Sequence, residues 1–308
     1  AIGKLNFDME CCAPEEGMEQ AGDDMALLGK HIHALTHSPE YAALVGELHA
    51  DGEGLSFAQR KTVEHLWERY EKGKNITEEF DHAWSVAANR AYGKWLTAKK
   101  ASDFSLFRDS LAEVVDFTRK AIDLRDEKPV SYYNACLDDT EKGGSEAQMD
   151  AFFGALKERI VPLMRRIQAE GKPIREDFLT RPCPIPEQER FSHYLLEAEG
   201  LRKSALVLMT TEHPFTTEFG PHDVRVTTHY FEDNFISNIF STLHEGGHAL
   251  FMQNEPEEFW REHTAGSMTN AMHECISRFY ENIIGRSEAF IHFVYPKLQE
   301  ISGDTFSD

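Results

Sequence analysis

Two histidines and a glutamate in the stretch STLHEGGHALF, residues 241–251, have the types and spacing of a hydrolytic metal site. His244 and His248 are four residues apart, so in a helix both imidazoles lie on one face and can bind the same ion. Glu245 is rotated by about 100° from His244 and therefore misses the ion, but it can reach a water molecule bound there. This H-E-x-x-H pattern is typical of zinc peptidases, in which the glutamate is the general base.

The segment around these residues is apolar on most sides, which predicts a buried helix. Its apolar residues are Phe235, Ile236, Ile239, Phe240, Leu243, Leu250 and Phe251. Buried histidines need polar partners, so a hydrogen-bonded pair in an ordinary core is the alternative interpretation. Gly246 and Gly247 also lie inside this helix, although each glycine costs about 1 kcal/mol relative to alanine at such a position.

A catalytic zinc site has three protein ligands and one open position. A third histidine at position 254 would complete the metzincin pattern, but the sequence has Asn254, which excludes that class. A carboxylate from a following helix is the alternative, and residues 269–286 have the pattern of such a helix. We predict Glu274 as the third ligand, with Glu281 as the second choice and His263, in the intervening loop, as the third.

Two histidines and one glutamate suit zinc, while cobalt or manganese is compatible with the same ligands. Metal-bound histidines usually donate their other ring nitrogen to an orienting group. Glu281 shares a polar stripe with Glu274 and is therefore also a candidate for that orienting role. The sequence thus predicts one divalent ion as the cofactor.

Composition limits the function classes. The chain has 308 residues and a net charge of −21, which argues against a nucleic-acid surface because such surfaces are rich in Lys and Arg. No apolar run approaches the roughly 20 residues that a membrane span needs, so we expect no membrane association. Five cysteines without framework spacing predict free thiols in a reducing compartment, the cytoplasm.

Most of the chain has apolar residues at helical spacing, which predicts a mainly α protein with these stripes in its core. The stripes occur at 80–95, 107–122 and 152–167. Residues 204–210 and 223–230 are rich in β-branched residues and predict a small antiparallel ribbon beside the metal helix. We therefore expect one region, 1–308, with a helical lobe at 1–180 and the ribbon and metal-binding helices at 181–308.

Four strings in the same order resemble the M32 family of metallocarboxypeptidases. They are HPF at 213–215, DVRVT at 223–227, HEGGHAL at 244–250 and HECISRFYEN at 273–282. The resemblance implies a multi-helix zincin-type metallopeptidase, usually a homodimer, that removes C-terminal residues from peptides. It also implies His244, His248 and Glu274 as ligands and Glu245 as the base, which takes a proton from the attacking water and passes it to the leaving amine.

The resemblance covers the part of the family that contains the metal site. The family's I-R-x-x-A-D and G-x-x-Q-D-x-H-W segments follow further downstream, whereas this sequence ends at Asp308. We therefore expect the chain to correspond to the N-terminal and metal-binding part of the enzyme. Gly246 is a second difference, because the family usually has a larger residue at that position.

Two residues are candidates for substrate binding. Arg225 could hold the terminal carboxylate of a peptide, although a structural pair with Asp223 fits the strand spacing equally well. His213 could contact substrate or order the turn before Pro214. Two other functions stay open: an oligoendopeptidase of a related H-E-x-x-H family, and a non-catalytic metal-binding fragment that needs a separate C-terminal chain.

Overall fold

The computed structural model describes residues 1–261 and 268–306, and it is mainly helical with one small three-stranded sheet. The chain divides into two compact units. Unit 1 comprises residues 1–9 and 13–146, and unit 2 comprises residues 10–12 and 147–308. The boundary at 180/181 that we expected from the sequence stays a prediction. No helix in the described ranges is long and apolar enough to cross a membrane.

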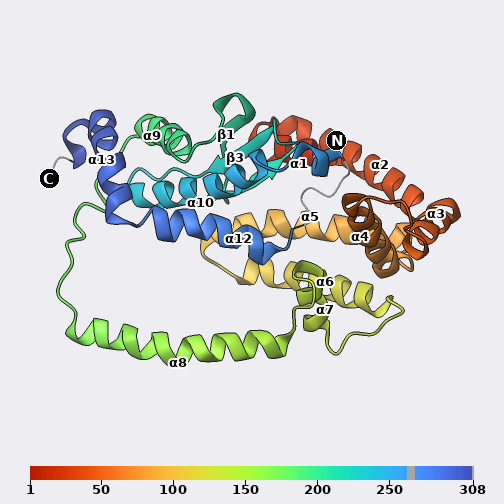
Figure 1. Cartoon of the computed structure of the whole chain (residues 1–308). Helices are drawn as coiled ribbons and strands as arrows, with labels where there is room; N and C mark the ends of the chain where they lie inside the picture. Colours follow the sequence, from red (N-terminus) through yellow and green to blue (C-terminus); the bar gives the residue numbers. More distant parts are fainter. Residues whose placement is uncertain (262–267, 307–308) are drawn as a thin grey trace. The chain divides into compact units, whose positions relative to one another are not determined.

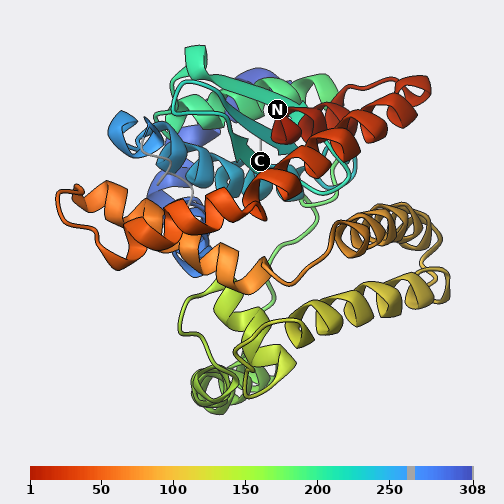
Figure 2. The same ribbon diagram turned by 90° about the vertical axis from the view of Figure 1, so that its right-hand side faces the viewer.

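Unit 1 is helical throughout its described elements, coloured red to yellow-green in Figures 1 and 2. The elements are α1 (Ile2–Cys11), η1 (Glu15–Gly17), α2 (Met18–Thr36), α3 (Pro39–Ala50), α4 (Phe57–Gly73), α5 (Glu78–Ala101), α6 (Ser105–Asp123) and α7 (Tyr132–Thr140). The Thr77 hydroxyl caps α5 by accepting a hydrogen bond from the Phe80 amide, as helix-start signals in the sequence predict. Ala87 and Ala91 of the predicted α5 stripe are buried, whereas in α6 only Ile122 of the predicted stripe is buried and Leu111 and Val115 are exposed.

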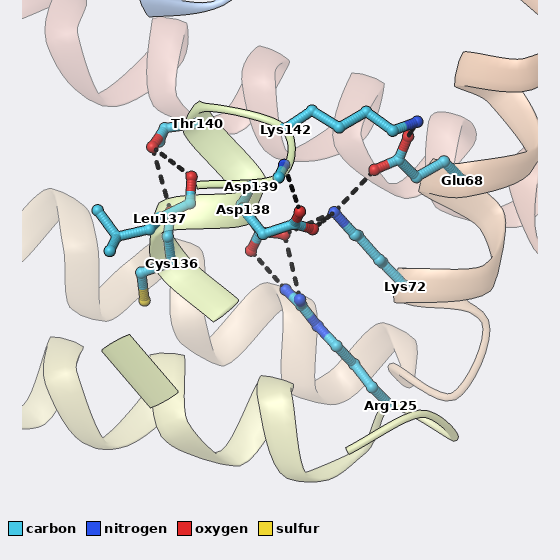
Figure 3. Close-up of polar contacts among 10 residues, drawn as sticks. Glu68, Lys72, Arg125, Cys136, Leu137, Asp138, Asp139, Thr140 and Lys142 are labelled. Atoms are coloured by element: carbon cyan, nitrogen blue, oxygen red, sulfur yellow. Dashed lines mark hydrogen bonds and ion pairs between the residues drawn. The ribbon is translucent and has the colours of Figure 1, made fainter. Parts of the chain in front are cut away.

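A cluster of ion pairs connects α7 to α4 within unit 1 (Figure 3). The Lys72 ammonium lies 2.9 Å from Glu68, 3.0 Å from Asp138 and 2.9 Å from Asp139. Arg125 makes a second ion pair with Asp139 at 2.5 Å. Burial opposes ionisation of Asp139, but the hydrogen bonds from Arg125 and Lys72 outweigh it and lower the pKa of this carboxyl. Lys142 lies 2.8 Å from Glu68, so three cations balance the three carboxylates, which indicates a structural role for the cluster.

Unit 2 is organised around α10, which lies between the sheet and α12 (Figure 1). Its elements are α8 (Glu146–Glu170), α9 (Ile185–Ala198), η2 (Lys203–Ala205), β1 (Leu206–Thr210), β2 (Thr216–Glu218), β3 (Val224–Thr228), α10 (Phe235–Gln253), α11 (Glu257–Arg261), α12 (Asn270–Arg278), η3 (Phe279–Ile284), α13 (Glu288–Ser302) and η4 (Gly303–Phe306). Phe235, Ile239 and Leu243 of α10 pack against Phe191 and Leu195 of α9 in a buried core. The predicted apolar helix is therefore present and buried.

The sheet has the order β1-β3-β2 and differs from the expected antiparallel ribbon. β1 and β3 match the two predicted strands, but they pair in parallel, with Leu206 opposite Val224. The antiparallel partner of β3 is β2, with Thr216 opposite Val226. The prediction was wrong on the pairing because β2, only three residues long, is too short to leave an alternating pattern in the sequence.

The apolar stripe of α8 also differs from expectation. The sequence predicts a core face there, but no residue of α8 is buried, and Phe152, Phe153 and Ile167 are all at least half exposed. Helical periodicity shows which face of a helix is apolar, but it carries no information on what covers that face. In the structure as described, every residue of the α8 stripe is more exposed to solvent than the residues of the core.

Candidate metal centre

His244 and His248 project from α10 toward Glu274 of α12. Their ligand atoms and a Glu274 oxygen all lie within 4.8 Å of one another. The Nε2 atoms of His244 and His248 each lie 3.7 Å from a Glu274 oxygen, too far for a hydrogen bond. Donors around a tetrahedral zinc are separated by roughly 3.4 Å, as follows from bonds of about 2.0–2.2 Å. The three side chains therefore fit a divalent ion.

The contact between His244 and Glu281 indicates which ring nitrogen of His244 carries the proton. The Nδ1 atom lies 3.0 Å from Glu281 Oε2, so Nδ1–H donates to this carboxylate and Nε2 keeps its lone pair for a metal. Burial opposes ionisation of Glu281, but hydrogen bonds from Arg286 and His244 lower the pKa of this carboxyl. Glu281 thus lies where the predicted orienting residue should be, on the ring nitrogen opposite the ligand nitrogen.

His248 is suited to metal binding by its surroundings. Burial lowers the pKa of the His248 imidazole to about 4. The ring is therefore neutral at pH 7, and a neutral imidazole is the form that binds a metal. His273 packs beside it at a ring-centroid distance of 5.6 Å.

Glu245 is buried and has a single side-chain partner in the described ranges. The Thr216 hydroxyl donates to Glu245 Oε2 at 2.7 Å. Burial raises the pKa of the Glu245 carboxyl, and this effect outweighs the hydrogen bond from Thr216, which lowers it. A raised pKa makes this carboxylate a better proton acceptor, as a general base requires.

A cavity of about 930 Å³ contains the three candidate ligands and Glu245. His213, one of the predicted substrate residues, lines this cavity. Arg225, the other, is not among the lining residues: its Nε and Nη2 atoms donate to Asp223 at 2.9 and 3.2 Å. The structure therefore shows the Asp–Arg pair that was the alternative interpretation of Arg225.

Sequence reasoning missed two arginines that line the cavity, Arg278 and Arg286. Both donate to Glu281, Arg278 at 2.8 Å and Arg286 at 3.2 Å. Arg278 follows Glu274 by four residues and so shares its polar stripe, but nothing in helical spacing pointed to Arg286. Residues 279–284 form the π-helical η3, so the expected continuous helix changes its geometry after Arg278. Such π segments occur frequently at functional sites.

Because Gly246 and Gly247 have no side chains, a buried carboxyl and the backbone of α12 can pack closely against α10. A Cβ atom at position 247 would lie 2.9 Å from the Ser277 Cα atom and 3.3 Å from the Ile276 carbonyl oxygen. Gly247 therefore lets the backbone of α12, which carries Glu274, pack directly on the metal helix. At position 246 a Cβ would lie 1.7 Å from Glu199 Oε2, so this glycine makes room for a buried carboxyl.

Glu199→Gln is expected to stabilise the protein by an amount that grows from pH 5 to pH 8. Burial raises the pKa of Glu199 well above its usual value, so the folded state keeps a proton that the unfolded state loses. Stability conferred by the wild-type residue therefore falls as pH rises above the unfolded pKa, and glutamine removes this dependence. Urea unfolding of both proteins at several pH values measures the difference in their free energies of unfolding. A difference that is the same at every pH would contradict the prediction.

His263, the third choice for the metal ligand, lies outside the described residues.

The chain belongs to the M32 family of metallopeptidases, since the family model "Carboxypeptidase Taq (M32) metallopeptidase" matches residues 1–308. It is 34% identical to carboxypeptidase 1 of Bacillus subtilis over 100% of this chain and 61% of that protein. It is also 34% identical to thermostable carboxypeptidase 1 of Pyrococcus furiosus, over 96% of this chain and 59% of that protein. The solved structure of Pyrococcus furiosus carboxypeptidase aligns with a TM-score of 0.88 and 30% identity, covering 99% of this chain and 61% of that one. The chain thus spans about three fifths of the length of these relatives.

Proposed function

We propose that this chain is a metal-dependent carboxypeptidase that removes C-terminal residues from peptides. The observation that supports the proposal best is the arrangement of His244, His248 and Glu274 around one point, with the buried Glu245 in the same cavity. This is the donor set of a catalytic zinc site with an adjacent general base. We propose cleavage at the C-terminus because the relatives of this chain are named carboxypeptidases.

The proposed mechanism is metal-assisted amide hydrolysis. A divalent ion, when bound, lowers the pKa of its water and polarises the scissile carbonyl. Glu245 accepts a proton from the attacking water and donates it to the leaving amine, which its burial favours. Glu281 holds His244 in the tautomer and orientation that direct Nε2 at the ion.

A carboxypeptidase must also bind the terminal carboxylate of its substrate. In the described part of unit 2, the arginines at the cavity are Arg278 and Arg286, so they are candidates for this role. His213 stays a candidate because it lines the same cavity, and Arg225 is the weakest candidate because it does not line the cavity and pairs with Asp223 instead. We keep zinc as the proposed ion, with cobalt or manganese as alternatives, and a cytoplasmic homodimer as the proposed form.

A pair of peptides that differ only at the C-terminus tests the specificity. We expect a peptide with a free carboxylate to be shortened from its C-terminus and its amidated counterpart to resist, which mass spectrometry of the products detects. Internal cleavage of both peptides would favour the oligoendopeptidase. If neither peptide is cleaved by the metal-loaded chain, the fragment that needs a separate C-terminal chain is the better description.

A further inference from the structure

The carboxylate of Glu245 is held from one side by a strand of the small sheet. Thr216 of β2 places its hydroxyl 2.7 Å from Glu245 Oε2 and 3.0 Å from the carbonyl oxygen of the same residue. The hydroxyl has one hydrogen, which the shorter contact and the negative charge direct to the carboxylate. No other hydrogen bond to this carboxylate occurs among the described residues, so Oε1 is the oxygen left to accept a proton.

Thr216 is itself held rigidly by the residue that precedes it. The Phe215 amide donates to the hydroxyl oxygen of Thr227 at 2.8 Å, and the Thr227 amide donates to the Phe215 carbonyl at 2.9 Å. Thr227 lies on β3 and is fully buried. The Thr211 hydroxyl, which donates to the His213 carbonyl at 2.7 Å, lies 3.0 Å from the Thr227 hydroxyl. These contacts fix the backbone of β2 immediately before the residue that reaches Glu245.

Two sequence strings that begin ten residues apart, HPF at 213 and DVRVT at 223, are hydrogen-bonded to each other and together support Thr216. Phe215 ends the HPF string, and Thr227 ends the DVRVT string. Their mutual hydrogen bonds join β2 to β3, and Thr216 carries the connection onward to α10. The hydroxyl of Thr216 is not needed to hold β2 in place, because the backbone pairing with β3 and the Thr227 contacts already do so.

We propose that Thr216 is a positioning residue, which fixes the rotamer of Glu245 and presents its Oε1 atom to the attacking water. This inference rests on the proposed function, in which Glu245 is the general base. A base works only within hydrogen-bond reach of the proton it takes, and a misplacement of about 1 Å can cost roughly 100-fold in rate. A free Glu245 side chain would spend much of its time in rotamers that point away from the reacting water.

Thr216→Val tests the proposal, because valine has nearly the same shape but lacks the hydroxyl. We expect kcat to fall by about 10- to 100-fold with KM within twofold, and Thr216→Ser to restore kcat to within about threefold. Thr217→Val is the matched control, since Thr217 is the next residue of β2 and makes no side-chain hydrogen bond in the described structure. It should leave both constants unchanged.

Crystal structures of the metal-free proteins supply a readout that does not depend on activity. In Thr216→Val the Glu245 carboxylate should leave its position or spread over several rotamers, while His244, His248 and Glu274 stay in place. Full activity together with an unmoved carboxylate would overturn the proposal. If the unchanged chain hydrolyses no peptide, the proposed function fails, and an unmoved carboxylate in the variant crystal would overturn the positioning role separately.

Discussion

Glu245→Gln is expected to lower kcat for peptide hydrolysis by about 100- to 10,000-fold, the contribution usual for a general base. Glutamine keeps the size of the side chain and can still accept the Thr216 hydrogen bond, but it cannot take a proton from water. The three candidate ligands are untouched, so the metal content should equal that of the unchanged chain. Steady-state kinetics on a peptide with a free C-terminus, beside elemental analysis of the same preparation, measures both quantities.

The control for this variant is Glu281→Gln, which alters a carboxylate of the same cavity without removing the base. It weakens the contact to His244 and should lower metal affinity by about 10- to 100-fold, the usual cost of losing such an orienting partner. At saturating metal, Glu281→Gln should therefore recover much more activity than Glu245→Gln. Activity of Glu245→Gln within a fewfold of the unchanged chain would show that another group accepts the proton.

Gly247→Ala is expected to destabilise the protein by about 1–3 kcal/mol, the usual cost of overpacking, even though alanine is the better helix former. The new methyl group would meet the Ser277 Cα atom at 2.9 Å, and backbone cannot move away as a side chain can. Separation of α12 from α10 would also carry Glu274 away from the histidines. We therefore expect weaker metal binding as well, which calorimetric titration with zinc would measure.

Gly246→Ala is the matched substitution on the same helix turn. Its methyl group would lie 1.7 Å from Glu199 Oε2 and 3.0 Å from Leu196 Cδ2, so the buried Glu199 side chain must shift; the gain of up to about 1 kcal/mol in helix propensity offsets part of that cost. Both atoms belong to side chains outside α12, so we expect the zinc affinity to stay close to that of the unchanged chain. Equal losses of zinc affinity in the two variants would show that close packing of α12 on Gly247 is not what sets the metal site.

The clustering of the candidate ligands could be predicted because helical spacing, a property of the local sequence, determines much of it. Two histidines four apart on an apolar helix lie on one face whatever the rest of the chain does, and in the structure His244 and His248 do lie close enough together to share an ion. Glu274 was also predicted, from the polar stripe of the next helix. The structure brings these three side chains within 4.8 Å of one another, while their roles as metal ligands and the catalytic roles stay proposals.

The contacts made between elements could not be predicted in the same way. Thr216 lies on a three-residue strand that leaves no pattern, and its contact with Glu245 depends on how β2 pairs with β3. Arg286 reaches Glu281 only because η3 and the turn after it bring the two together. The reason for Gly246 is the carboxyl of Glu199, 47 positions earlier in the sequence, and helix propensity alone gives no hint of it.

The central claim is that His244, His248 and Glu274 form one metal site. Elemental analysis of the purified chain, beside Glu274→Ala prepared identically, tests it most directly. We predict close to one equivalent of zinc or another divalent ion in the unchanged chain and a strong loss in the variant. A metal-free chain that also fails to bind added zinc, or a Glu274→Ala variant that binds as tightly as the unchanged chain, would contradict the claim.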